Sequence, residues 1–140
     1  MTDSLDGDRA LVDTARAALH RSEVAHREMA ETPLPGSPPE WATDHAILAD
    51  QAAHQAKCLA NLDLGQSIDP SGLNALWAGE EALRREAGGW RALGAVATEE
   101  FWRTEFHASA DEADREAASI EDLRHRLFHR DHGAELGIER

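Results

Sequence analysis

The chain has 140 residues, a formal net charge of −13 at neutral pH and a single cysteine. This length suits one domain with its own core, and the lone cysteine excludes an internal disulfide and favours a reducing compartment such as the cytoplasm. An acidic surface without a cationic stripe argues against nucleic-acid binding, and the apolar runs are too short for the roughly 20 residues that cross a bilayer.

Apolar residues recur at spacings of three and four in every segment between the glycine and proline clusters, which predicts helices and no strands. The first helix is expected over residues 8–31. The second opens on Ser37, which with Glu40 matches a capping box and places Pro38 at the first helical position. Gly65 is a natural residue for its C-terminal end.

The third helix is predicted to open at Asp69, a good N-cap residue followed by proline. The pair Gly88-Gly89 is expected to end it. Thr98 is the predicted cap of the fourth helix, whose first acidic residues favour the positive end of the helix dipole. This last helix is expected to be the longest, at about 32 residues, and to stop near Gly133.

Four amphipathic helices with short connections predict an all-α, up-down-up-down four-helix bundle with a long C-terminal helix. Residues 8–132 form the expected domain, with flexible ends at 1–7 and 133–140. The last turns of the long helix, with Leu127 and Phe128, are expected to overhang the bundle. They suggest one function, a non-catalytic interaction or regulatory protein that forms homo-oligomers through this helix.

Polar residues interrupt the apolar stripes of all four predicted helices. If the helices alternate in direction, the rise of about 1.5 Å per residue places them at similar depths below one end of the bundle. The depth is about 7 Å for both histidines and about 9–12 Å for the glutamates. The predicted polar layer contains His26, His45, Glu80 and Glu105, with Glu23 as a fifth member.

Imidazole and carboxylate groups are ligands for Fe, Mn and Zn, and helical bundles hold such sites in their cores. Glu23 and His26 have the i, i+3 spacing of di-iron carboxylate proteins, but no second such pair follows, so a mononuclear site is the simpler form. The other interpretation is a metal-free layer, because arginines nearby in sequence would neutralise the carboxylates: Arg27, Arg84, Arg85 and Arg103.

The principal functional hypothesis is therefore a protein that holds a divalent metal or a small polar ligand between its helices. Trp41, Trp102 and Phe106 would line or close this pocket. A metal-free enzyme is a further alternative, in which a histidine and a glutamate act as general acid and base. No motif names a reaction or a substrate.

Two other groups of residues are candidates for a functional site. His125 and His129 have an i, i+4 spacing that can chelate a metal ion, but they lie opposite the apolar stripe and are expected to be solvent-exposed. Cys58 lies at the edge of a stripe and is expected to be a small buried thiol with no base beside it.

Overall fold

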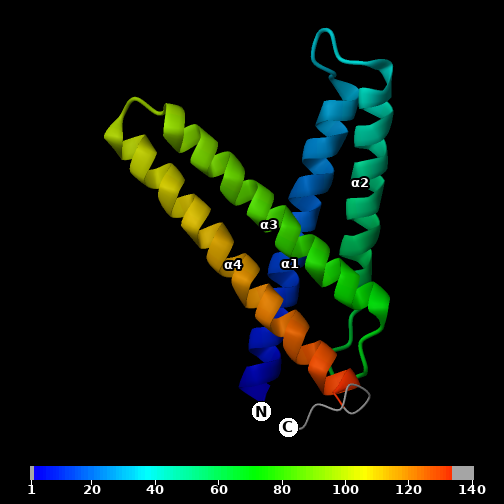
Figure 1. The fold of residues 1–140 in the computed structure, drawn as a ribbon. Helices are drawn as coiled ribbons and strands as arrows, with labels where there is room; N and C mark the ends of the chain where they lie inside the picture. Colours follow the sequence, from blue (N-terminus) through cyan, green and yellow to red (C-terminus); the bar gives the residue numbers. More distant parts are fainter. Residues whose placement is uncertain (1, 134–140) are drawn as a thin grey trace.

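The computed structural model describes residues 2–133, with side chains from Leu5 onward, and this part of the chain contains four α-helices and no strand. Successive helices run in opposite directions (Figure 1). The predicted all-α, up-down-up-down four-helix fold with its longest helix at the C-terminus is confirmed. The helices are α1 (Thr2–Glu31), α2 (Pro39–Ala60), α3 (Pro70–Val96) and α4 (Glu100–His132).

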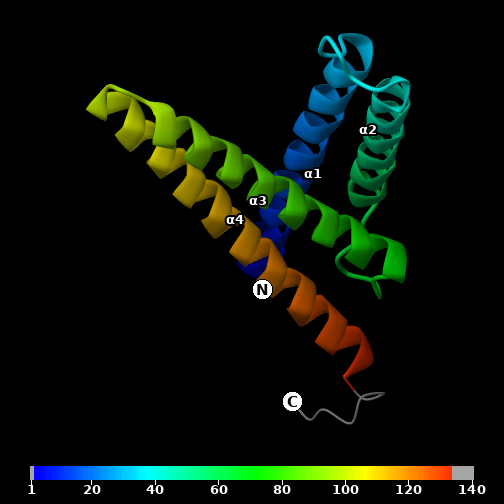
Figure 2. The same ribbon diagram turned by 45° about the horizontal axis from the view of Figure 1, so that its top comes forward.

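The four helices form two hairpins that cross. α1 packs along α2, and α3 packs along α4. α3 also contacts both helices of the first hairpin, whereas α2 and α4 do not touch within residues 2–133. Figures 1 and 2 show the loop between α1 and α2 pointing away from the loop between α3 and α4. The hairpins therefore overlap at one end and diverge at the other.

Small residues set the point where α1 and α3 cross. A Cβ atom built on Gly79 would lie 2.6 Å from the Cβ atom of Ala15 and 3.1 Å from its Cα atom. Ala15 is fully buried, as are Ala75 and Leu76 on α3. Because only hydrogen occupies the Cβ position of Gly79, the two backbones can approach this closely.

The C-terminal turns of α4 are tied to the loop between α2 and α3. Arg130 donates hydrogen bonds of 2.8 Å to the carbonyl oxygens of Leu64 and Gln66. A carboxylate oxygen of Asp131 accepts from the backbone N–H of Ile68 at 2.7 Å. Leu127 is buried in the core. The predicted overhang of these turns is therefore wrong, and the end of α4 that extends away from the other hairpin is its N-terminal end.

The helix boundaries differ from the predictions in two ways that matter for the shape. α1 already begins at Thr2, so residues 2–7, expected to precede the first helix, are helical. α3 continues through Gly88 and Gly89 to Val96. Each glycine costs a helix about 1 kcal/mol relative to alanine, which packing of α3 along α4 outweighs. Residues 134–140, predicted as part of a flexible tail, lie outside the described residues.

The N-terminal caps of α2 and α4 also differ from the predictions. Pro38 occupies the N-cap of α2 without a side-chain hydrogen bond, so the capping box at Ser37 is not formed. Glu99 takes the N-cap of α4 in place of Thr98. The predicted cap of α3 is confirmed, because the Asp69 carboxylate accepts from the backbone N–H of Gly72 at 2.9 Å. None of the helices in the described range is apolar over a length that would cross a membrane.

Candidate functional site

His26 of α1 and His45 of α2 contact each other directly. Their Nδ1 atoms lie 2.8 Å apart and their rings are stacked, with centroids separated by 5.0 Å. With both rings neutral, one Nδ1–H donates to the other Nδ1. Burial lowers the pKa of His26, and the nearby His45 and Arg85 lower it further. His26 therefore favours the neutral imidazole, whose unprotonated nitrogen can accept a proton or bind a metal.

Trp41 covers one side of this histidine pair. Its ring lies 4.2 Å from the ring of His45, measured between centroids. Its indole Nε1 is buried without a hydrogen-bond partner among the described residues. An unpaired buried donor is costly, and this one belongs to the ring that contacts His45.

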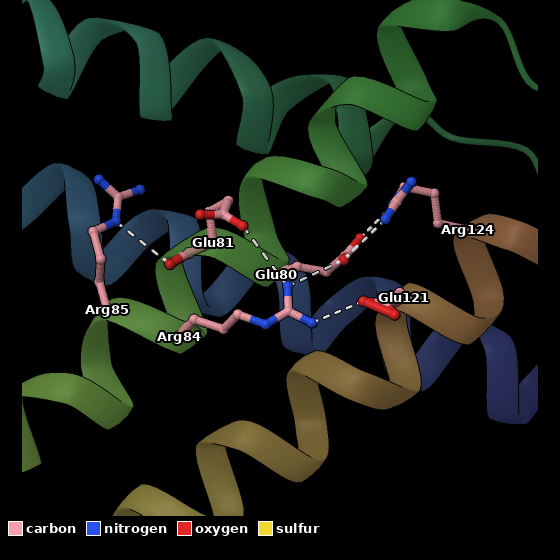
Figure 3. Close-up of polar contacts among 6 residues, drawn as sticks. All are labelled: Glu80, Glu81, Arg84, Arg85, Glu121 and Arg124. Carbon is pink, nitrogen blue, oxygen red and sulfur yellow. Dashed lines mark hydrogen bonds and ion pairs between the residues drawn. The ribbon is translucent and has the colours of Figure 1, made fainter. Parts of the chain in front are cut away.

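Glu80 of α3 is fully buried between α3 and α4, in the second hairpin. It accepts hydrogen bonds from Arg124 of α4, at 2.5 Å from Nε and 3.2 Å from Nη2, and a longer one of 3.4 Å from Arg84 (Figure 3). Arg84 also binds Glu121 at 2.9 Å. The hydrogen bond to Glu80 raises the pKa of Arg124. The arginines neutralise this carboxylate, as the metal-free interpretation required.

The remaining two glutamates of the predicted layer have other surroundings. Glu23 accepts from Arg27 at 3.0 Å and lies 3.7 Å from His20. Glu105 is exposed near the N-terminal end of α4. In residues 2–133 no three His, Cys, Asp or Glu side chains are placed to share a metal ion. The five residues do not form one layer. Because the hairpins diverge, residues at the same distance from their own hairpin loop do not lie beside one another.

An open cleft of about 330 Å³ lies where α3 meets the first hairpin, and His26 is part of its wall. Leu48 and Trp77 supply apolar surface. The polar side chains around the cleft come from α1, α2 and α3 and comprise Ser22, His26, Gln51, Gln55, Glu81 and Arg85.

Arg85 is the cation of this cleft. Its Nε donates a long hydrogen bond of 3.4 Å to the backbone carbonyl of Glu81, and no carboxylate pairs with it in the described part of the chain. In Figure 3 its two terminal nitrogens extend away from the Glu80 network. Sequence reasoning treated Arg85 only as a neutralising partner. Its position one turn after Glu81 was visible in the sequence, but the cleft beside it was not, because that cleft forms where α3 meets α1 and α2.

The other two predicted pocket residues, Trp102 and Phe106, lie on the second hairpin; they do not line this cleft but a separate, open pocket of about 450 Å³ beside the loop between α3 and α4. They stack on each other at 6.0 Å near the loop between α3 and α4, and Trp90 stacks on Phe106 at 5.8 Å. Trp41 and Trp102 therefore do not close a common pocket. They belong to different hairpins, whose loops point apart.

The predictions for the His125 and His129 pair and for Cys58 have different outcomes. His125 and His129 are solvent-exposed, as predicted. Cys58 is partly buried, and its Sγ lies 3.7 Å from Nε2 of His54, so the expectation that no base lies beside it is wrong. The i, i+4 spacing of these two residues is the sequence signal that was missed.

Comparison with protein-family models, with curated proteins and with solved structures finds no match to this chain.

Proposed function

We propose that the protein binds a small acidic molecule in the cleft between its hairpins. The observation that carries the proposal is Arg85, a cation without a carboxylate partner among the described residues, in the same cleft as His26. A guanidinium group binds a carboxylate or a phosphate through two parallel hydrogen bonds. A ligand with one such group would supply the partner that the chain does not.

The carboxylate of Glu81 lies 3.7 Å from Arg84, and the other side chains of the cleft suit the neutral part of such a ligand. Ser22, Gln51 and Gln55 offer hydroxyl and amide groups that can both donate and accept hydrogen bonds. Trp77 and Leu48 provide apolar contact. A volume of about 330 Å³ lies at the lower end of the range for small-molecule sites, which favours a compact metabolite. Binding in the cytoplasm is part of the proposal, supported by a lone cysteine that has no disulfide partner.

Titration of the protein with citrate and with inorganic phosphate tests this proposal. Binding is expected to shift the NMR signals of the Trp77 indole and the Arg85 Nε–H. Arg85→Gln is expected to weaken binding by about tenfold or more, the effect of losing one charge-assisted contact. Arg16→Gln, on the exposed face of α1, is the matched control and should leave binding unchanged. If neither probe binds, or if Arg85→Gln binds as tightly as wild type, the proposal fails.

The histidine pair supports a second candidate, a divalent metal bound by His26 and His45. Two nitrogens bonded to one tetrahedral ion at about 2.1 Å lie about 3.4 Å apart, so these Nδ1 atoms, 2.8 Å apart in the hydrogen-bonded pair, would separate by about 0.6 Å to share it. Water or the acidic ligand would complete the coordination, and imidazole ligands favour Zn over Mn. The same titration with Zn²⁺ decides the matter: binding that survives His26→Gln would rule this candidate out.

A further inference from the structure

The cleft that contains Arg85 also carries a carboxylate that is open to a ligand. Glu81 lies one helical turn before Arg85 on α3, and its side chain is 40% exposed. In the described part of the chain its carboxylate makes one polar contact, an ion pair of 3.7 Å with Arg84 that is too long for a hydrogen bond. The hydrogen bonds that this carboxylate can accept are therefore available to another molecule.

The charge of Glu81 is not balanced by the buried network behind it. Arg84 lies within ion-pair distance of three carboxylates, which are those of Glu80, Glu81 and Glu121 (Figure 3). Arg124 adds a second cation, at Glu80. Three negative charges against two positive ones leave one negative charge in excess. Arg84 is closest to Glu121, at 2.9 Å, so the excess falls on Glu81.

The spacing of Glu81 and Arg85 fits the two charges of an amino acid. Side chains four residues apart on a helix have Cβ atoms about 5–6 Å apart. The Nε of Arg85 is bonded to its own helix, whereas its two terminal nitrogens extend away from the Glu80 network (Figure 3). A free α-amino acid carries its carboxylate and its ammonium group on one carbon atom. Arg85 can therefore bind the carboxylate while Glu81 accepts hydrogen bonds from the ammonium group.

The apolar lining of the cleft offers contacts for the side chain of such a ligand. Three buried residues form the floor of the cleft, one each from α1, α2 and α3: Leu19, Ala52 and Ala78. Leu48 and Trp77 are partly exposed and stand at its rim. Trp77 lies one turn before Glu81 on α3, so an apolar side chain can contact the indole ring while the ammonium group contacts Glu81.

We propose that the ligand of the cleft is a free α-amino acid with an apolar side chain. This inference rests on the proposed function, because Arg85 binds the carboxylate in both. It adds the requirement for a positive charge beside that carboxylate, since Glu81 attracts an ammonium group and repels a second anionic group. Citrate and phosphate are therefore expected to bind through Arg85 alone, and more weakly than the amino acid.

Isothermal titration calorimetry of the full-length chain with phenylalanine and with 3-phenylpropionate tests the inference. The two molecules share the ring and the carboxylate, and only phenylalanine has the ammonium group. Phenylalanine is expected to bind about tenfold more tightly, the effect of one charge-assisted hydrogen bond. Glu81→Gln should remove most of this difference, and should leave the binding of 3-phenylpropionate no weaker than in wild type.

Glu121→Gln is the matched control. The Glu121 side chain is 42% exposed and also pairs with Arg84, but it does not line the cleft. This variant should keep the preference for phenylalanine, and circular dichroism establishes that both variants are folded. Equal binding of the two molecules to wild type would overturn the inference, as would a preference that Glu81→Gln keeps or that Glu121→Gln loses.

The same titrations distinguish failure of this inference from failure of the proposed function. If 3-phenylpropionate, citrate or phosphate binds through Arg85 and phenylalanine binds no better, the amino acid is overturned while binding of an acidic molecule stands. If none of the four molecules binds, both are overturned.

Discussion

Replacing Glu80 with alanine is expected to lower the free energy of unfolding by about 3–5 kcal/mol, the usual cost of removing one partner of a buried ion pair. The carboxylate is fully buried, and its loss leaves Arg124 between α3 and α4 without its carboxylate partner, whereas Arg84 keeps its ion pair with Glu121. The measurement is urea unfolding followed by circular dichroism, comparing midpoints and slopes with wild type.

Two further variants test whether the loss of stability comes from the unpaired buried charge. Glu121→Ala removes the exposed partner of Arg84 and should cost less than about 1 kcal/mol, as exposed ion pairs do. Leucine at both Glu80 and Arg124 removes the two charges together and should recover much of the loss, because apolar replacement of a whole buried pair is often neutral. A single Glu80→Ala variant as stable as Glu121→Ala would show that the buried network does not hold the hairpin together.

Gly79→Ala is expected to destabilise the fold by about 1–3 kcal/mol, the cost of overpacking a tight contact. The added methyl group would lie 2.6 Å from Ala15 Cβ, so α1 and α3 must separate at their crossing. This cost exceeds the gain of about 1 kcal/mol that alanine brings to a helix. The readout is again the free energy of unfolding in urea.

Gly88→Ala is the control for the same helix. A Cβ atom there meets nothing within 4 Å, so the variant should gain about 0.5–1 kcal/mol from the lower entropy cost of alanine. Ala15→Gly should partly rescue Gly79→Ala by clearing the space that the methyl group needs. If Gly79→Ala and Gly88→Ala proved equally stabilising, the close crossing would not exist in solution.

The periodicity of apolar residues was sufficient to predict the helices, their order and their alternating direction. It could not predict that α3 passes through Gly88, because the compensating contacts come from α4, which follows later in the chain. The periodicity also could not predict that the two hairpins cross. This crossing depends on one glycine meeting one alanine on a distant helix, and glycine inside a helix has the same local signature wherever it lies.

Some contacts of the candidate site could likewise be predicted from the sequence, and others could not. His26 and His45 come together because both lie about 7 Å from the loop of one antiparallel hairpin, a distance that the sequence supplies. The bond of Arg84 to Glu80 follows from an i, i+4 spacing within one helix. Arg124 could not be assigned to Glu80, since the pairing needs the register of α3 against α4. Nor could the cleft beside Arg85 be predicted, because it forms where α3 meets α1 and α2.

The two hairpins diverge from the crossing of α1 and α3 (Figure 1), and a distance between the two hairpin loops tests this arrangement directly. Spin labels on Glu31→Cys, at the end of α1, and Thr98→Cys, before α4, can be measured by pulsed electron resonance with Cys58→Ser to remove the native thiol. Labelled chains diluted into unlabelled protein report the distance within one molecule. Neighbouring helices of a closed bundle lie about 8–10 Å apart. Both labels lie about 25 Å along the helices from the crossing of Ala15 and Gly79, so diverging hairpins predict a label separation well above that spacing. A single population at about 15 Å or less would show a closed bundle and contradict the open arrangement.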